Sequence, residues 1–421
     1  MVEIRILKRR SLIPVEDALR VFLYQFQRGS LGSETIRTDN ALGRVASEDI
    51  IAPMNLPQQN RAAMDGYAIR STDTSKASKS NLVTLEVVGN VDIGSVPNIV
   101  LSPGQAVTVA TGALVPASAN AVLMLELARK AGRSKISTMH AGAPGEHVAR
   151  IGEDVVKGSV VLKRGLRLKP QDLGIIAALG QEEVRVFRRP TVACLSTGNE
   201  IVRHKRKLLP GEVYDVNGPV IRAMVREIGC EPIDLGVSPD DRKILREKLL
   251  TGFNRADVTL VSGGTSVGER DIVPEVVSSL GKPGVIIHGV KMRPGSPVGL
   301  ACVDGKAIVL LSGYPVAAMM AFRVFVRPLL AYLQSSVQEP DAKVRARLLT
   351  GVRSHKGIRT FARVRLRTVH DGFVAELIQT SGAGIVSSMT EADGLLVIPE
   401  IEEGYRKGKE VEIILLRPME P

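Results

Sequence analysis

Five short apolar runs, spaced by helical patterns, constrain the fold of this 421-residue sequence more than any other feature. The runs are TVACL (191–195), PIDLGV (232–237), ADVTLV (256–261), VIIHGV (285–290) and AIVLL (307–311). Strands that are apolar along their whole length are buried on both faces, as happens when helices cover both sides of a parallel sheet. The sequence therefore predicts an α/β domain with a largely parallel sheet over residues 181–335.

Capping and proline signals place the helices between these runs. One helix is predicted to open at Asn217, with Pro219 in its first turn, and to end before Gly229. Proline suits the first turn of a helix, and glycine suits its end. Further helix starts are expected at three places: near Asp240, near Asp271 and after Pro315.

The rest of the chain separates into segments of different composition. A helix is predicted to begin at Pro14 and to stop at Gly29. Residues 51–140 change to short β-rich runs divided by Gly, Pro and Asn, and residues 336–421 are β-rich again. We expect five segments: a linker domain in two parts (1–50 and 141–180), a β-rich insertion (51–140), the α/β domain (181–335) and a C-terminal β domain (336–421).

Polar residues and glycines follow each predicted strand. In open α/β sheets, ligands bind beyond the carboxyl ends of the strands, so these residues define a candidate site. The candidates are Thr197, Gly198, Glu200, Asp240, Ser262, Gly263, Gly264, Ser266, Asp271, Lys291, Arg293, Ser296, Ser312, Gly313 and Pro315. Backbone N–H groups at helix starts, together with Lys291 and Arg293, favour an anionic ligand.

The glycine-rich stretch VSGGTSVGERDI (261–272) has the glycine spacing of a phosphate loop, but Glu269 and Arg270 stand where that loop has lysine and serine or threonine. It is therefore not a loop of the nucleoside-triphosphatase type. A carboxylate beside a phosphate needs a cation between them. Glu200, Asp240 and Asp271, with no Cys or His among them, suit a hard cation with oxygen ligands, most simply Mg²⁺.

Each feature also has a purely structural interpretation. STGNE (196–200) fits a turn, and Asp240 and Asp271 fit helix N-caps. A functional site is favoured because all of these residues are expected at one edge of the sheet. His288 lies in an apolar run and is expected in the core. In FARVRLRT, Arg363, Arg365 and Arg367 alternate with apolar residues and share one strand face, which we expect to be solvated.

The net charge of +12 favours anionic partners. A nucleic-acid-binding role is disfavoured because only 3% of residues are aromatic and the sequence holds no helix-turn-helix or zinc-finger pattern. The three cysteines lack metal-site spacing and are expected to be buried thiols in a reducing compartment. No signal peptide or membrane-spanning run is apparent, so we expect a cytoplasmic protein with no membrane partner.

Seven stretches carry a resemblance to a known family. They are MDGYAIR, RIGEDVVKGSVVL, LSTGNEI, VYDVNG, SGGTSVGERD, MRPGSP and SSMTEADGLLVIPE. In this order, and across essentially the whole chain, they resemble the molybdopterin molybdenumtransferases, the molybdenum insertases of cofactor biosynthesis. The resemblance implies a molybdopterin-binding α/β domain, a linker domain with a β-rich insertion, and a C-terminal β-barrel.

The resemblance also implies an activity and an assembly. Molybdate, or tungstate, enters the dithiolene of adenylylated molybdopterin with Mg²⁺ present, and AMP is released. The implied protein is a homodimer, and a molybdopterin adenylyltransferase is a further expected partner. The acids that match the family are Asp65, Asp154, Glu200, Asp240 and Asp271. Asp65 and Asp154 are expected to face the cleft of the partner subunit.

The chain departs from the family pattern at the basic loop and at the last turn. Gly289, Arg293 and Ser296 stand where the family often has lysines, and Ser312 and Tyr314 replace residues of the usual P-G-N-P. These changes leave the preferred oxyanion open. Two other functions stay in view: a molybdopterin-binding scaffold without turnover, and a nucleotide pyrophosphatase on the same α/β domain.

Overall fold

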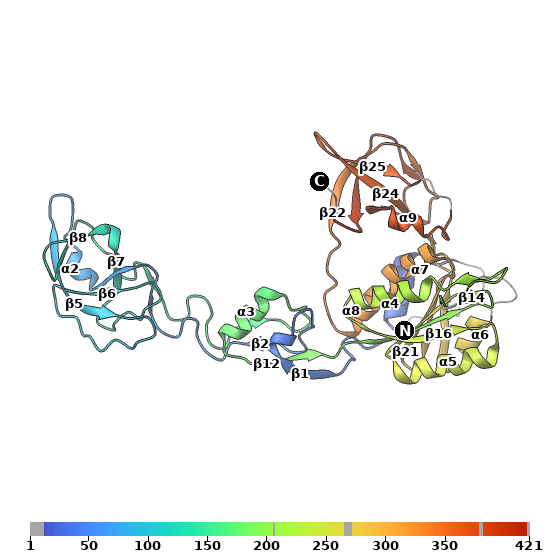
Figure 1. Cartoon of the computed structure of the whole chain (residues 1–421), viewed down its shortest axis with the longest axis horizontal. Coiled ribbons are helices and arrows are strands. Elements are labelled where there is room, and N and C mark those ends of the chain that lie inside the picture. Colours follow the sequence, from blue (N-terminus) through green and yellow to red (C-terminus); the bar gives the residue numbers. More distant parts are fainter. Residues whose placement is uncertain (1–11, 205–206, 265–271, 379–381, 419–421) are drawn as a thin grey trace.

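The computed structural model describes residues 12–204, 207–264, 272–378 and 382–418. Figure 1 shows an elongated chain, with a β-rich unit at one end and an α/β unit beside a β-barrel at the other. A linker unit lies between them. The chain passes through this linker twice, so that β1 (Ser33–Arg37) pairs with β12 (Glu183–Phe187) in antiparallel register. The β-rich unit is thus an insertion within the linker.

The α/β unit is built on a six-stranded sheet in the order β16-β13-β17-β21-β20-β18. The strands are β13 (Thr191–Thr197), β16 (Glu231–Ser238), β17 (Val258–Ser262), β18 (Pro283–His288), β20 (Gly299–Val303) and β21 (Lys306–Leu311). The first four strands in the sheet order are parallel, whereas β20 is antiparallel to both of its neighbours. The prediction of a largely parallel sheet is confirmed, but β20 was not predicted and makes the sheet mixed.

The helices of the α/β unit begin at the predicted places or two residues later. They are α4 (Asn217–Glu227), α5 (Arg242–Arg255), α6 (Val273–Ser278) and α7 (Pro315–Ala321). A π-helical turn (Phe322–Val326) continues α7 into α8 (Arg327–Leu333). Among the described residues, Pro315–Leu333 is the one helical stretch long and apolar enough to cross a membrane, and it is mostly buried in the protein core.

The first helix begins as predicted but is shorter than expected. α1 (Val15–Leu23) follows Pro14 and ends well before Gly29. The reason is local: the N–H groups of Gln25 and Phe26 bond in tight turns to the carbonyls of Phe22 and Leu23. The Phe26 ring then packs edge-on against the Phe22 ring, with the centroids 5.2 Å apart.

The inserted unit carries a six-stranded sheet in the order β7-β4-β6-β5-β9-β8. The strands are β4 (Gly66–Ile69), β5 (Val83–Val91), β6 (Gln105–Val109), β7 (Ala121–Met124), β8 (Ala128–Lys130) and β9 (Lys135–Thr138), with α2 (Ser71–Thr74) and a 3₁₀ turn (Leu125–Leu127) beside them.

The linker holds α3 (Pro170–Ala178), a 3₁₀ turn (Thr38–Asn40) and two short strand pairs, β2 (Ile50–Ile51) with β11 (Val160–Leu162) and β3 (Arg61–Ala62) with β10 (Val148–Ala149). The domain boundaries drawn from the sequence stay predictions.

The C-terminal region is a closed five-stranded barrel, as expected. Its strands are β22 (Lys343–Leu348), β24 (Arg359–Val369), β25 (Gly372–Leu377), β26 (Gly394–Ile398) and β28 (Glu410–Leu415). The ring closes because β24 pairs with both β25 and β26. Smaller elements complete the region: β19 (Met292–Arg293), β23 (Val352–Arg353), β27 (Gly404–Tyr405) and α9 (Ser387–Thr390).

The solvated face predicted for the β24 arginines is wrong for Arg363, which is only 9% exposed. Arg363 lies directly opposite Leu395 of β26, and residues opposite each other in a sheet share a face. Leu395 and Phe361 belong to the same apolar cluster as α7 and α8, so the α/β unit covers this end of the barrel. Burial lowers the pKa of Arg363 below its ordinary value. Arg365 is exposed and pairs with Glu391.

One arginine ties the barrel to the N-terminal helix. The Arg359 guanidinium lies 2.9 Å from Glu16 Oε1 of α1 and 3.1 Å from Glu400 Oε1 of the barrel. Next to it, β19 extends the barrel sheet by pairing with β24. The segment after β18 therefore leaves the α/β sheet and joins the barrel, which fixes the barrel beside the carboxyl edge of the sheet.

Candidate active site

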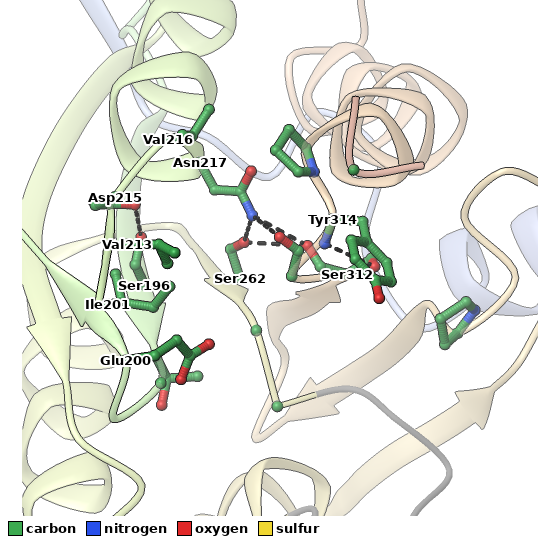
Figure 2. Close-up of a pocket in the computed structure, with 18 of the residues that line it drawn as sticks. Ser196, Glu200, Ile201, Val213, Asp215, Val216, Asn217, Ser262, Ser312 and Tyr314 are labelled. Atoms are coloured by element: carbon green, nitrogen blue, oxygen red, sulfur yellow. Dashed lines mark hydrogen bonds between the residues drawn. The ribbon is translucent and has the colours of Figure 1, made fainter. Parts of the chain in front are cut away.

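A pocket of about 1240 Å³ lies at the carboxyl edge of the α/β sheet, where β13, β17 and β21 end. Its wall also includes residues before and at the start of α4, the turn before α7, and Gly384 and Val386 from the barrel region. Figure 2 shows the labelled side chains converging on this space from separate segments of the chain. The pocket is therefore where the sheet-edge argument predicted a site.

The floor of the pocket is a buried polar network. The Asn217 side-chain N–H group donates to Ser262 Oγ (2.6 Å), to the Gly313 carbonyl (2.9 Å) and, more weakly, to the Ser312 carbonyl (3.3 Å). Ser262 Oγ donates in turn to the Ser312 carbonyl at 3.2 Å. These contacts join α4 to the ends of β17 and β21 (Figure 2). The floor is thus fixed before any ligand arrives.

Asp215 fixes the start of α4. Its Oδ1 atom accepts from the Ser196 hydroxyl at 2.8 Å and from the Gly218 backbone N–H at 2.9 Å. This carboxylate accepts a hydrogen bond from a helix N–H group, and its negative charge is stabilised by the positive end of the helix dipole. It also links α4 to β13. In the sequence, Asp215 is part of the VYDVNG motif, but no role was predicted for it.

Two of the predicted acids lie on the rim of the pocket. Glu200 and Asp240 are both exposed and line it. Asp240 Oδ1 accepts from Thr197 Oγ1 at 3.1 Å, and the Asp240 N–H donates to the Asn199 side chain at 3.0 Å. The N-cap of α5 is the next residue, Asp241, which accepts from two backbone N–H groups. The N-cap interpretation of Asp240 is therefore wrong, and its carboxylate faces the pocket.

Position 263 has to be glycine because the ends of β13 and β17 come close together there. Its φ angle is +103°, a region that favours glycine. A Cβ atom at this position would lie 2.2 Å from the Thr197 carbonyl oxygen. Gly264, Gly313 and Pro315 line the same wall. The backbone can come this close to a ligand because no side chain intervenes.

The other predicted ligand contacts have mixed outcomes. Ser296 lines the pocket, but its hydroxyl donates to the Val290 carbonyl at 2.9 Å and so holds its own loop. Lys291 and Arg293 are not among the lining residues, because the chain turns there to form β19. Ser266 and Asp271 lie outside the described residues.

Asp65 and Asp154 lie away from the pocket of their own chain. Asp65 directly precedes β4 in the inserted unit, at the far end of the molecule from the α/β unit (Figure 1). Its Oδ1 accepts from the Thr111 N–H (2.7 Å) and Thr111 hydroxyl (2.8 Å), and these bonds hold the pKa of Asp65 below its ordinary value. Asp154 is exposed in the loop after β10, and its N–H donates to the Leu56 carbonyl at 3.0 Å.

The donor set on the rim suits a hard divalent cation. Glu200 and Asp240 offer exposed carboxylate oxygens beside the glycine wall, and these are the ligands that Mg²⁺ prefers. Within the described part of the chain, no group of three or more His, Cys, Asp or Glu side chains is arranged to hold a metal. The third predicted acid, Asp271, lies outside the described residues, so the predicted set stays a prediction.

Several lining residues were not predicted as part of the site, and three of them are Asn217, Tyr314 and His288. Asn217 was recognised only as a helix start, Tyr314 only as a departure from a family pattern, and His288 was expected in the core. His288 is half-buried and lines the pocket, because β18 ends at the same sheet edge as the parallel strands. The shared feature that would have found them is their place at a strand end or helix start on that edge.

The chain matches three family descriptions in order. Residues 13–180 match the MoeA N-terminal region (domain I and II), residues 193–332 match a probable molybdopterin binding domain, and residues 345–416 match the MoeA C-terminal region (domain IV). The pocket residues from Ser196 to Pro315 fall within the second match.

Relatives align over nearly the whole chain. A Methanocaldococcus jannaschii protein named for molybdopterin biosynthesis is 33% identical, over 97% of this chain and 99% of its own length. The molybdopterin molybdenumtransferase of Bacillus subtilis is 30% identical, over 98% and 96%. Among solved structures, a molybdopterin biosynthesis MoeA protein from Pyrococcus horikoshii has a TM-score of 0.84 and 34% identity, covering 96% of this chain and 100% of that one.

Proposed function

The chain belongs to the MoeA family of molybdopterin biosynthesis proteins, and on that premise we propose that it is a molybdopterin molybdenumtransferase. In this proposal it inserts molybdate into the dithiolene of adenylylated molybdopterin and releases AMP. The observation that carries it is the pocket itself, which places a fixed polar floor, a bare backbone wall and two carboxylates at one sheet edge. A large, polar and anionic substrate needs these three kinds of surface together.

The chain's own groups act mainly by holding and orienting the substrate. The glycines of the wall, Gly263, Gly264 and Gly313, let phosphate oxygens approach the backbone without a side chain in between. The Asn217–Ser262–Ser312 network keeps that wall rigid, so that substrate binding does not have to order it. We propose that positioning of the phosphoanhydride, rather than a strong general base, accounts for most of the rate.

Mg²⁺ fits the rim and would be held by Glu200, Asp240 and Asp271. When bound, it supplies positive charge that neutralises the oxygens of the phosphoanhydride. The Thr197 hydroxyl, which donates to Asp240 Oδ1, orients that carboxylate at the rim of the pocket. Lys291 and Arg293, the two cations predicted to contact an anionic ligand, do not line the pocket. The proposal therefore leaves the choice between molybdate and tungstate open.

Asp65 and Asp154 enter the proposal through a second subunit. Both are exposed, and neither lines the chain's own pocket. Asp65 belongs to the inserted unit, which lies at the opposite end of the molecule from the α/β unit (Figure 1). We propose a homodimer in which this end of one chain borders the pocket of the other. The cytoplasm is the proposed location, and a molybdopterin adenylyltransferase that supplies the adenylylated substrate is a proposed partner.

The test is AMP release from adenylylated molybdopterin with Mg²⁺, with molybdate or tungstate added in turn. Asp240→Asn is expected to reduce release by at least tenfold, because it removes a rim charge. The matched control is Asp241→Asn, the adjacent N-cap residue of α5, where asparagine caps as well as aspartate and release should be unchanged.

Three other results would contradict the proposal. Tight binding of the substrate without any AMP release would favour a scaffold. Release from free dinucleotides without an oxyanion would favour a nucleotide pyrophosphatase. Equal release by the Asp240→Asn and wild-type proteins would remove the rim carboxylate from the mechanism.

A further inference from the structure

One wall of the pocket is carried by an arm that leaves the α/β sheet. The arm runs from Gly198, directly after β13, to Asp215, just before α4, and the structure describes its residues 198–204 and 207–215. Figure 2 shows part of the arm along one side of the pocket. Its lining residues are Gly198, Glu200, Ile201, Val213, Tyr214 and Asp215. The place of the Glu200 carboxylate on the rim therefore depends on how the arm is held.

The arm has little packing of its own. None of its described residues from 199 to 214 is buried. Its two strands, β14 (Ile201–Val202) and β15 (Val213–Tyr214), pair over two residues each, and the Val213 N–H donates to the Glu200 carbonyl at 2.9 Å. So short a strand pair is marginally stable in water without support from other parts of a protein.

Support comes from Asp234, which lies outside the arm on β16, an edge strand of the sheet. The Arg203 guanidinium of the arm forms an ion pair with Asp234 Oδ2. Asp234 Oδ1 accepts from Arg222 Nη1 of α4 at 3.1 Å and from the Gly236 N–H at 2.8 Å. One carboxylate thus connects the arm to the edge strand and to the helix that follows the arm.

A β-bulge lies directly beside Asp234. Asp234 is opposite Cys194 of β13, but the next opposed pair is Gly236 with Leu195, so Leu235 is an extra residue. Bulges of this kind redirect side chains and are common next to active sites. Burial raises the pKa of Asp234, but the Gly236 N–H and the two arginines outweigh burial and hold the pKa below its ordinary value. Asp234 is therefore a charged anchor.

We propose that Asp234 is a positioning residue for Glu200: it fastens the arm through Arg203 and so holds the Glu200 carboxylate on the rim. Neither Asp234 nor Arg203 lines the pocket, so both act through the arm and not by contact with a substrate. This inference rests on the proposed function for the role of Glu200, which would bind Mg²⁺ there.

The first measurement is hydrogen–deuterium exchange of the full-length chain at pH 7. Asp234→Asn removes the charge, while the asparagine oxygen can still accept the Gly236 N–H, so the bulge is kept. Peptides of the arm should exchange about threefold faster in this variant, the size expected for loss of a partly exposed ion pair. Exchange in the rest of the α/β unit should stay as in the wild type.

The second measurement is the Mg²⁺ dependence of AMP release. Because Glu200 is less well placed in Asp234→Asn, half-maximal release should need severalfold more Mg²⁺, whereas the KM for adenylylated molybdopterin should change less. A purely structural role would lower the amount of active protein without moving the Mg²⁺ midpoint. Binding of Mn²⁺ alone, followed by electron paramagnetic resonance, makes the same comparison without turnover.

Controls come from the same strand and from the arm. Glu231→Gln removes an exposed carboxylate at the start of β16 and should leave both measurements unchanged. Arg203→Gln should resemble Asp234→Asn, and Arg203→Lys, which keeps a cation, should stay close to the wild type. The double variant Arg203→Gln/Asp234→Asn should be no worse than Asp234→Asn alone, because both changes remove the same ion pair.

The proposal is overturned if the arm of Asp234→Asn exchanges at the wild-type rate, or if it exchanges faster while both the Mg²⁺ midpoint and Mn²⁺ binding stay unchanged. It is also overturned if Glu231→Gln has the same effects. A wild-type chain that releases no AMP would contradict the proposed function, and exchange together with Mn²⁺ binding would still decide the role of Asp234. Absence of Mn²⁺ binding as well would remove the metal site, and this inference with it.

Discussion

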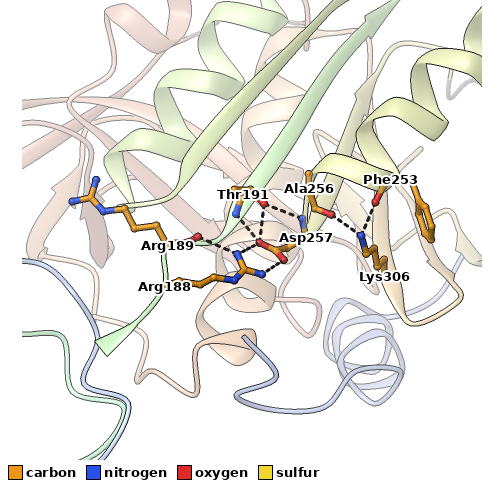
Figure 3. A network of polar contacts seen from close by, with 7 residues as sticks. All are labelled: Arg188, Arg189, Thr191, Phe253, Ala256, Asp257 and Lys306. Atoms are coloured by element: carbon orange, nitrogen blue, oxygen red, sulfur yellow. Dashed lines mark hydrogen bonds and ion pairs between the residues drawn. The ribbon is translucent and has the colours of Figure 1, made fainter. Parts of the chain in front are cut away.

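Arg188 and Asp257 form a two-point ion pair that ties the end of β12 to the beginning of β17 (Figure 3). Arg188 Nη1 lies 2.7 Å from Asp257 Oδ2, and Arg188 Nη2 bonds to the other carboxylate oxygen. The N–H and hydroxyl of Thr191, at the start of β13, also donate to Asp257 Oδ2, at 2.8 and 2.9 Å. One carboxylate thus joins the linker unit to two neighbouring strands of the α/β sheet.

Replacing Asp257 with asparagine is expected to destabilise the protein by about 1.5–3 kcal/mol, because charge-assisted hydrogen bonds to a mostly buried carboxylate are lost. Chemical denaturation at pH 7 would measure the change in the free energy of unfolding. Asp39→Asn is the control, since Asp39 pairs with Arg37 on the surface and is 80% exposed. The interpretation fails if both substitutions have the same small effect.

The Asp257 contribution is also expected to depend on pH. Burial alone would raise its pKa, but the Arg188 side chain and the Thr191 groups outweigh burial and hold the pKa below its ordinary value. A group with a lowered pKa in the folded state stabilises the protein above its unfolded pKa of about 3.9, and this contribution is lost as the pH falls through the folded pKa. The stability difference between wild type and Asp257→Asn should be full at pH 6 and should shrink below pH 4.

Gly263→Ala is expected to distort the pocket. The added Cβ atom would lie 2.2 Å from the Thr197 carbonyl oxygen, so the ends of β13 and β17 would have to separate. Gly305→Ala is a matched control, because Gly305 also has a positive φ (+81°) but nothing lies within 4 Å of its Cβ position. Gly305→Ala should cost about 1 kcal/mol. Gly263→Ala should cost more and should also weaken AMP binding, whereas equal costs would show that the contact with Thr197 does not matter.

Thr111→Val is expected to raise the pKa of Asp65 toward its ordinary value. The Thr111 N–H bond, the larger cause of the lowered pKa, remains in this variant, while the hydroxyl bond is lost. Thr111→Ser keeps a hydroxyl and should leave the pKa where it is. Carbon-13 NMR titration of the Asp65 carboxyl group measures the shift directly. An unchanged pKa in the valine variant would mean that the backbone bond alone sets it.

The three cysteines are expected to be unreactive in the folded protein. All are free and buried, and burial raises the pKa of the Cys194 and Cys230 thiols to about 12. Only the thiolate reacts rapidly with disulfide reagents, so labelling at pH 8 should be slow before unfolding and complete after it. Rapid labelling of a cysteine in the native protein would contradict the buried positions.

Much of the α/β unit was predictable because its signals are local. Asn217 and Pro315 begin helices as expected, since caps and prolines act within one turn. The strand Gly299–Val303 was not among the five predicted runs, although GLACV is as long as TVACL. It forms a hairpin with β21 through the turn at Asp304 and Gly305. Arg363 was misplaced because strand alternation cannot tell which face another unit will cover.

The site was predicted in outline for a different reason. Thr197, Ser262 and Ser312 follow parallel strands, and topology alone brings such residues to one edge. Lys291 was included by the same rule, but the segment that carries it pairs with the barrel, and that pairing joins residues that are distant in sequence. The bonds of the Asn217 side chain were beyond prediction from the sequence, since they join segments that are distant in the chain.

The distance of Asp65 from its own pocket has a genetic consequence. In the dimer proposed above, each pocket borders the partner's inserted unit, so an Asp65→Asn chain keeps a sound pocket and an Asp240→Asn chain keeps a sound inserted unit. A mixed dimer of the two would contain one pocket with neither substitution and one with both. Two chains that fail separately would therefore restore activity when produced in the same cell.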